Sequence, residues 1–593
     1  MGLLKNLIKI NCLLIFFIIN EIKIIKKKFL YFSKYYLAEV NCFFFIKKIF
    51  YKNKNYFKIE NFNKYIIVNK NIWKDSNKNF SKKKILIESF INHPIYTIAN
   101  CLIGIKLAEF YKLKCIGIIR SGDLYAEEIM RSFNIKKVLK INEGNFFLRL
   151  YFFLKSIKIF NSIKSIKSLV KYKIKKIEIG KSTYEQFIRF NQDLYKNNIN
   201  KYLYKNLMDA LIYNDQAKKI FNKDNIKYYI QSETQYIPHR IFFQNALINN
   251  IQIFSRSGVN NISIKKYETF HDRNINRLKL SKKLFYNFYN KKKYEILKKI
   301  NPTIKKTFKE KKFGLEVYQL FKNKISRYNE FKSKKEICKH FGWLEERPIV
   351  IILAHNLTDG NFINQWSLFL DDEEWIVETI KKIKLINKVN WIIKPHPSEN
   401  LIKNETKKSE YILNKLCKYE KHIKIFPSNY NLNNSVKFMS YAITAHGSAG
   451  YEYPSLGVPT IVTGDSFYTN LGFTIEPKTK YEYFKILKQL SKPRAINKVK
   501  INKARIFWYL YNILTKVNVP IIPFFNITAE YNKTKSRVLR TQIAHIKEMI
   551  EKKKKIERAK EKKKEDAEDD DNDEEDDNEE DEEEEEEIGR AHV

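Results

Sequence analysis

The sequence predicts an α/β protein with two doubly wound, mostly parallel sheets that face one another across a cleft. Three observations support this class. Short apolar runs of strand length alternate with amphipathic helical segments in both halves of the chain. The chain has 593 residues, which is too long for a single hydrophobic core. Polar or glycine-containing turns follow several apolar runs, and doubly wound sheets bind ligands at these carboxyl ends of their strands.

The second half shows the alternation most clearly. Strands are predicted at 348–354, 389–394, 422–426, 441–445 and 458–464. Between the first two, the segment 371–386 starts with four acidic residues and carries lysines near its end, which suits a helix dipole. We therefore expect a C-terminal Rossmann-like domain over 346–526.

The first half follows the same pattern more loosely. Strands are predicted at 84–89, 114–121, 226–232 and 251–257, with helices at 94–113 and 237–249 between them. This predicts an N-terminal Rossmann-like domain over 81–274. The lysine-rich, helical segment 275–345 is expected to connect the two domains.

The two ends of the chain differ from this body. Residues 1–80 form a basic extension whose apolar run, Cys12 to Ile19, is shorter than the ~20 residues that span a bilayer. It is either an amphipathic helix on the membrane surface or a packed or poorly ordered extension. A charged helix is expected over 527–564 and an acidic, disordered tail over 565–593. The last six residues, IGRAHV, resemble a translated sequencing adapter and are expected to be an artefact.

The formal charge is +46, although residues 565–587 contain 20 acids. Lys, Ile, Asn, Phe and Tyr are abundant throughout, which is typical of an AT-rich gene and explains most of this charge. A basic surface would still attract anionic sugar nucleotides and acidic lipids. The six cysteines are scattered without a CxxC pair, which argues against a disulfide framework or zinc site and indicates a reducing compartment.

The stretch WIIKPHPSEN, residues 391–400, ends a predicted strand with a cation and an imidazole. Lys394 can neutralise a phosphate, and the flanking prolines fix the direction of His396. A protonated His396 could bind a pyrophosphate oxygen or donate a proton to a leaving phosphate. The alternative is that these residues only shape the exit of the strand.

The stretch AHGSAGYEYPSLGVP, residues 445–459, also follows a strand and opens a short helix. Gly447 would let the backbone approach a ligand, and Ser448 would cap the helix, whose free N–H groups suit a phosphate. Glu452 could accept hydrogen bonds from ribose hydroxyls. The alternative is a plain capped helix with a solvated Glu452.

These two stretches, together with LFLDDEEWIVETI upstream, resemble bacterial capsule and surface-polysaccharide biosynthesis proteins. Those proteins look like GT-B-fold glycosyltransferases related to capsular Kdo transferases and, more distantly, to CDP-glycerol glycerophosphotransferases. The resemblance covers residues 345–480. It implies that the domain over 346–526 binds a nucleotide sugar, with a CMP-activated donor favoured, and that the domain over 81–274 binds the acceptor. It also implies that nucleotide phosphates and ribose contact His396, Pro397, Gly447, Ser448 and Glu452. Lys394 and Ser398, in the first stretch, are further candidate substrate ligands. His446 stands where the resemblance predicts no fixed residue.

On the acceptor side, transfer with inversion needs a carboxylate or histidine near the acceptor hydroxyl. Glu88 and Glu233 are the candidate bases, and His93 is a candidate substrate ligand, because all three follow or end predicted strands. The alternative for each carboxylate is that it caps the next helix. The acids at 371–374 are explained as a helix start, so we expect no essential metal and no cofactor.

The first functional hypothesis is a cytoplasmic glycosyltransferase, peripheral on the inner face of the cytoplasmic membrane, that acts on a polysaccharide or glycolipid acceptor. The second is a polyol-phosphate transferase with a CDP-activated donor. A third is a basic, non-catalytic binding protein or scaffold. We expect no nucleic-acid partner, because no nucleic-acid-binding module is recognised.

Overall fold

A computed structural model describes most of the predicted body. The described residues are 11–22, 62–76, 82–91, 94–121, 123–163, 165–190, 199–258, 261–309, 329–360, 366–396, 399, 406, 408–417, 420–432 and 435–518. The predicted charged helix, the acidic tail and three of the candidate site residues, His93, Pro397 and Ser398, lie outside these residues.

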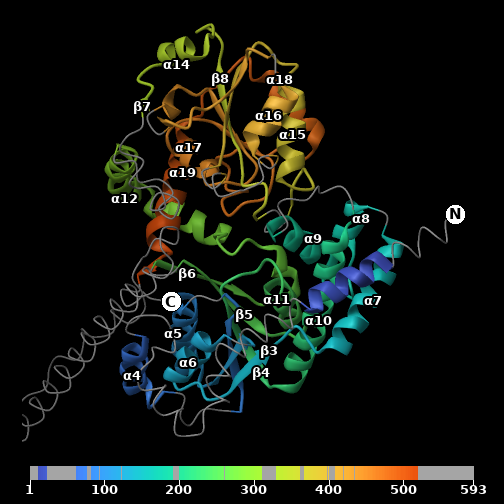
Figure 1. The fold of residues 1–593 in the computed structure, drawn as a ribbon. Coiled ribbons are helices and arrows are strands. Elements are labelled where there is room, and N and C mark those ends of the chain that lie inside the picture. The colour runs from blue at the N-terminus through green and yellow to red at the C-terminus, as the bar shows by residue number, and fades with distance from the viewer. Residues whose placement is uncertain are drawn as a thin grey trace, which may run out of the picture.

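The first domain contains a seven-stranded sheet with the order β14-β6-β5-β4-β1-β2-β3 (Figure 1). The strands are β1 (Lys84–Ser89), β2 (Lys114–Arg120), β3 (Val138–Ile141), β4 (Ile226–Gln231), β5 (Gln252–Ser257), β6 (Asn261–Tyr267) and β14 (Val517–Asn518). The strands from β5 to β3 run parallel, whereas β6 pairs antiparallel with β5 and with β14. This is the doubly wound, mostly parallel sheet that the alternation predicts.

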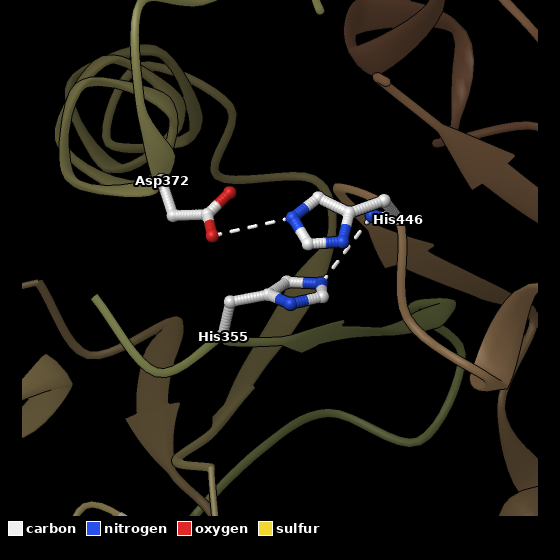
Figure 2. Close-up of side chains that lie close together, drawn as sticks. All are labelled: His355, Asp372 and His446. Carbon is white, nitrogen blue, oxygen red and sulfur yellow. Dashed lines mark hydrogen bonds and ion pairs between the residues drawn. The ribbon is translucent and has the colours of Figure 1, made fainter. Parts of the chain in front are cut away.

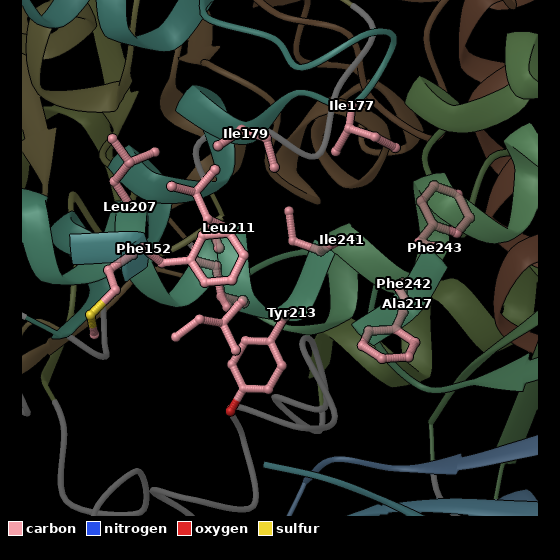
Figure 3. Close-up of a cluster of buried hydrophobic side chains, with 14 of the residues drawn as sticks. Phe152, Ile177, Ile179, Leu207, Leu211, Tyr213, Ala217, Ile241, Phe242 and Phe243 are labelled. Atoms are coloured by element: carbon pink, nitrogen blue, oxygen red, sulfur yellow. The ribbon is translucent and has the colours of Figure 1, made fainter. Parts of the chain in front are cut away.

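Helices cover both faces of this sheet, which explains why its central strands are apolar throughout. Along β1, Ile85 and Ile87 point to one core, whereas Leu86 points to the other. The first core includes α4 (Phe62–Trp73), α5 (Pro94–Tyr111) and α6 (Leu124–Ser132). The second core includes α7 (Phe146–Ser162), α8 (Ile166–Lys171), α9 (Ile179–Phe190), α10 (Lys201–Lys223) and α11 (His239–Ile248). Figure 3 shows part of this second core.

Residues 11–22 form a helix that packs against α7 and α10 (Figure 1). The ring of Phe17 stacks on Phe153 at 4.7 Å, and Glu21 forms a buried ion pair with Arg149 at 2.6 Å. This part of the N-terminal extension is therefore built into the first domain. Among the described residues, no helix combines the length and the apolar character needed to cross a bilayer.

The second domain contains a parallel, five-stranded sheet with the order β10-β9-β8-β12-β13. Its strands are β8 (Ile349–Leu353), β9 (Asn390–Lys394), β10 (Ile423–Ile425), β12 (Tyr441–Thr444) and β13 (Thr460–Val462). Val350 and Ile352 pack with the helices α15 (Asp372–Ile383), α16 (Ser409–Leu416) and α18 (Lys480–Gln489). Ile349 and Ile351 pack on the other side with α14 (Lys334–Phe341) and α17 (Ala449–Ser455). The fold therefore contains two Rossmann-like domains, as predicted.

The chain passes between the domains more than once. After the 3-10 turn η1 (Phe270–Asn274), the long helix α12 (Lys282–Lys309) packs with α19 (Lys498–Tyr509) in a shared core. The π-helical turn η5 (Leu510–Leu514) then leads back to β14 in the first sheet. The remaining short elements are β7 (Asn329–Glu330), which pairs with β11 (Tyr430–Asn431), and the turn η4 (Val436–Phe438).

The packing of helix 11–22 leads to a stability prediction. Phe17→Ala should lower the free energy of unfolding by about 3 kcal/mol, because it removes a buried ring and leaves a cavity. Ile18→Ala, one position along on the exposed face, should change it by less than about 0.5 kcal/mol. Urea unfolding of the two variants measures the difference. Equal stability of both variants would contradict the packing of this helix.

Candidate functional site

The strand order of the second sheet reverses beside β8. From β8 the chain moves outward to β9 and β10 on one side, and then returns to β12 and β13 on the other. The connections that leave the carboxyl ends of β8 and β12 therefore run in opposite directions. Doubly wound sheets bind ligands in the crevice between two such connections. His355 lies just beyond the end of β8, and His446 lies just beyond the end of β12. The reversal brings these two histidines together.

His355, His446 and Asp372 form a compact cluster at this position (Figure 2). The two imidazole rings lie 4.1 Å apart between centroids, at an interplanar angle of 35°. Nε2 of His446 lies 3.3 Å from Oδ2 of Asp372, the first residue of α15. The backbone N–H of His446 donates to Nε2 of His355 at 3.3 Å. An Nε2 that accepts this bond carries no proton, so a neutral His355 is protonated on Nδ1.

The turn after β12 is shaped around the His355 ring. The Thr444 hydroxyl lies 3.0 Å from Nε2 of His355 and accepts a hydrogen bond from the Gly447 N–H at 3.1 Å. A Cβ at position 447 would lie 3.1 Å from Cε1 of His355 and 3.0 Å from Oγ1 of Thr444. The close approach of the His355 ring and the Thr444 hydroxyl is one reason for a glycine at position 447, because a larger residue would crowd both groups.

His396 reaches the same region from β9, the neighbour of β8. Burial lowers the pKa of His396 to about 4. The positive charge of Lys394 also lowers this pKa, whereas the negative charges of Asp359 and Asp372 raise it. Burial likewise lowers the pKa of His355 to about 3, and the charges of His446, Asp372 and His396 also act on it. His396 and His355 are therefore neutral near pH 7. The charge of His446, in the turn after β12, is one of those that act on His396, in the turn after β9.

Lys394, at the end of β9, is largely buried and therefore poorly solvated. Its Nζ lies 5.6 Å from the centroid of the Phe426 ring. Burial lowers its pKa, while the charge of Glu399 raises it. Glu399 itself accepts hydrogen bonds from the N–H and the hydroxyl of Ser409. A phosphate beside Lys394 would therefore meet a poorly hydrated ammonium group, which strengthens their attraction.

Ser448 and Glu452 interact with each other. The Ser448 side chain makes no capping bond to the start of α17 and instead hydrogen-bonds to the Glu452 carboxyl group, four residues along the helix. Burial raises the pKa of Glu452 to about 7. Near neutral pH this carboxyl group can therefore either donate or accept a hydrogen bond.

Polar contacts join the loop after β8 to the first domain. The Tyr236 hydroxyl donates to Oδ1 of Asp359, and Arg189 pairs with Oδ2 of Asp359 at 2.9 Å. The Tyr184 hydroxyl donates to Asp371 at 2.9 Å. Tyr236 follows β4, whereas Tyr184 and Arg189 belong to α9. These contacts hold the carboxyl edge of the first sheet opposite that of the second.

The first sheet reverses its strand order between β1 and β4, and Glu88 lies near this point. The Tyr229 hydroxyl donates to one carboxylate oxygen of Glu88, and Nδ1 of His239 lies 2.9 Å from the other. Glu88 is completely buried. This placement argues against Glu88 as the candidate base: Tyr229 and His239 cover both of its oxygens, so it does not reach an acceptor hydroxyl in this structure.

Glu233 lies on the loop after β4. Its Oε1 accepts hydrogen bonds from the N–H groups of Thr234 and Gln235, at 2.8 and 3.1 Å. Its Oε2 lies 3.4 Å from Nη1 of Arg277, which is long for a charged hydrogen bond. The side chain retains 18% of its exposure. Of the two candidate bases, Glu233 is the one that solvent and a substrate can reach.

Sequence reasoning missed His355, Asp359 and Asp372, and it assigned no role to His446. The acids at 371–374 were explained as a helix start, and this is correct for Asp371, which caps α15 by accepting from the Glu374 N–H at 2.9 Å. Asp372 instead faces His446. His355 and Asp359 follow a predicted strand, so a search of every strand end for polar residues would have found them.

The cluster also contains the ligand types of a transition-metal site. One ligand atom from each of His355, Asp372 and His446 lies within 4.8 Å of the others. Nε2 of His355 and Nε2 of His446 already face hydrogen-bonding partners. A cation at this position would therefore compete with these hydrogen bonds.

No protein-family model matches the chain, and no curated protein sequence matches it. Among solved structures, the beta Kdo 2,4 transferase KpsC of Thermosulfurimonas dismutans aligns with 49% of this chain and 94% of its own, at 13% identity and a TM-score of 0.27. The UDP-GlcNAc 2-epimerase of Methanocaldococcus jannaschii in complex with UDP-GlcNAc and UDP aligns with 72% and 99%, at 14% identity and a TM-score of 0.25. S. aureus MnaA with UDP aligns with 73% and 97%, at 12% identity and a TM-score of 0.23. Such distant likenesses assign neither a family nor an activity.

The lowered pKa of His396 predicts how stability depends on pH. The unfolded chain takes up a proton near the ordinary value of 6.5, whereas the folded protein does so only near 4. Protonation therefore favours the unfolded state, and the free energy of unfolding should fall as the pH drops from 6.5 to 4. His396→Asn should flatten this slope, whereas His340→Asn, on the exposed surface of α14, should not. Urea unfolding across this pH range tests it, and an unchanged slope in His396→Asn would contradict the assignment.

Proposed function

We propose that this protein is a glycosyltransferase that moves a sugar from a nucleotide-activated donor to a glycan or glycolipid acceptor in surface-polysaccharide biosynthesis. The main support is the cluster of His355, His446 and Asp372 at the strand-order reversal of the second sheet, with His396 near enough for its charge to act on His355. Titratable groups with perturbed pKa values at such a position are typical of a site that handles charged substrates. The proposed location is the inner face of the cytoplasmic membrane.

The donor phosphate is proposed to lie beside His396 and Lys394. A neutral imidazole can be buried without a partner charge, and an arriving phosphate would raise its pKa. His396 would then take up a proton and donate it to the phosphate oxygen as the bond from that oxygen to the anomeric carbon breaks. Pro397 and Ser398 follow directly in the sequence and are proposed, from the motif alone, to contact the donor as well.

The Ser448–Glu452 pair is proposed to bind the ribose of the donor. A carboxyl group with a pKa of about 7 can accept from one ribose hydroxyl or donate to another. Gly447 keeps the turn between this pair and His355 narrow. The resemblance of the two motifs to capsular transferases favours CMP as the nucleotide.

On the acceptor side, Glu233 is proposed to remove the proton of the attacking hydroxyl. The new bond joins the acceptor oxygen to the anomeric carbon, and the nucleotide leaves with the electron pair of the broken bond. Tyr236, three residues from Glu233, binds Asp359 of the second domain, so the loop with the base is tied to the loop that follows β8. Glu88 supports this edge from within through His239.

A donor assay tests the proposal. The purified protein should release CMP from CMP-Kdo faster than from CDP-glycerol, and release should persist in EDTA because the proposed reaction uses no metal. His396→Ala should reduce release by about 10²–10⁴-fold, the usual contribution of a general acid. His340→Ala, in the same domain but outside the site, should retain wild-type turnover.

Three results would count against this proposal. Unchanged turnover in His396→Ala would remove the assigned acid. Release of CMP from CDP-glycerol alone would favour a polyol-phosphate transferase. Loss of turnover in EDTA, restored by a divalent cation, would instead point to a metal at His355, Asp372 and His446.

The two carboxylates of the first domain should respond differently to substitution. Glu233→Gln should lower kcat by at least about 10²-fold while CMP affinity and thermal stability stay near wild type. Glu88→Gln should mainly destabilise the fold, by about 1–3 kcal/mol, because it disturbs buried hydrogen bonds to Tyr229 and His239. Steady-state kinetics, calorimetric titration with CMP and thermal unfolding separate these effects. A normal kcat in Glu233→Gln would exclude it as the base.

A further inference from the structure

The helix of residues 11–22 is apolar on both of its faces. Its inner face packs through Leu13 and Phe17 into the first domain. Its outer face exposes a stripe of four isoleucines at helical spacing: Ile15, Ile18, Ile19 and Ile22, which are 57, 51, 44 and 57% exposed. A surface helix of a globular protein normally carries polar residues on its outer face. The stripe therefore requires an explanation other than core packing.

The neighbouring helix α7 exposes a second apolar stripe. Phe147, Tyr151 and Leu154 are 79, 57 and 48% exposed and recur at helical spacing. Ring contacts connect the two helices, since Phe146 lies 5.9 Å from Phe17 and 5.7 Å from Phe147. Phe146 is itself 44% exposed. We call the exposed side chains of both stripes, with Phe146, Lys155 and Lys158, the apolar–basic face.

Lysines outnumber acids around this face, although Glu143 is 50% exposed just before the start of α7. Residues 146–177 contain eight lysines and one arginine, and no aspartate or glutamate. Lys155 and Lys158 are exposed on α7 itself, and Lys155 lies 5.9 Å from the Tyr151 ring centroid. Arg149 is buried, where it pairs with Glu21, so the one acid of helix 11–22 is neutralised in the interior. The outward charge of this region is therefore positive.

We propose that the apolar–basic face binds the surface of an anionic lipid bilayer. Isoleucine, leucine and aromatic side chains can enter the boundary between head groups and acyl chains, while nearby lysines are attracted by anionic head groups. A protein partner is a poorer match, because lysine is depleted in protein–protein interfaces. This inference concerns a surface of the first domain and does not depend on the proposed chemistry.

The position of the face is compatible with catalysis between the two domains. Helix 11–22 and α7 lie on the outer side of the first domain, whereas α9 of the same helical group carries Tyr184 and Arg189 to the second domain (Figure 1). A bilayer on the apolar–basic face would therefore leave the loops at His355 and His446 uncovered. An enzyme with a lipid-linked acceptor would benefit from such attachment.

Vesicle co-sedimentation of the full chain tests the inference. The protein should bind vesicles of phosphatidylcholine and phosphatidylglycerol, and it should bind pure phosphatidylcholine vesicles at least about tenfold more weakly. Lys155→Glu/Lys158→Glu should lower binding to the anionic vesicles by at least about tenfold, and Phe147→Ser/Tyr151→Ser should lower it as well. Added salt should weaken binding, because it screens the lysines.

Matched controls come from the second domain. Lys485→Glu/Lys488→Glu has the same charge change and spacing on the exposed surface of α18, and Leu385→Ser/Tyr481→Ser removes side chains that are 76 and 78% exposed. Both controls should bind anionic vesicles like the wild type, and circular dichroism confirms that every variant is folded. The inference is overturned if the wild type does not bind anionic vesicles, if the controls weaken binding as much, or if Phe147→Ser/Tyr151→Ser instead abolishes a dimer of the free protein.

Discussion

Parallel strands end at a common edge, and the order in which the chain visits them decides which ends become neighbours. In both sheets the order reverses beside the first strand, next to β1 in one domain and next to β8 in the other. Each reversal places a histidine against a carboxylate: His239 against Glu88, and His446 against Asp372. The first pair is sealed in the interior, and the second remains partly open. The site therefore depends on topology before it depends on any single side chain.

Burial gives the open pair and its neighbours their chemical state. His355 and His396 avoid the cost of a buried charge by staying neutral, and their pKa values of about 3 and 4 express that cost. An anionic ligand would favour the protonated imidazoles, because its negative charge would add to that of Asp359 and Asp372. The contacts of Asp359 with Tyr236 and Arg189 keep one carboxylate engaged across the two domains. Binding, proton uptake and domain alignment are thus expected to be coupled.

Much of the fold could be predicted from the sequence because strands that are covered on both faces must be apolar throughout. The rule that ligands meet the carboxyl ends of strands also selected Lys394, His396 and Gly447. It did not reveal the cluster, because His355 and His446 are 91 residues apart, and only the reversal joins them. It also placed Glu88 at an edge without revealing that Tyr229 and His239 close over it. Position along a strand predicts proximity to a site, but not whether a neighbouring side chain covers it.

The overall charge of +46 says little about any one surface, since lysine is common throughout the chain. Composition can explain a basic face, but it does not explain why apolar residues are exposed beside it at helical spacing. On helix 11–22 the inner face packs into the core, whereas the four outer isoleucines remain 44–57% exposed to water. Exposed apolar area on both helices is unfavourable until it is covered. An anionic lipid surface would account for both the exposed apolar side chains and the lysines beside them. It removes the apolar side chains from water and provides the opposite charge to the lysines.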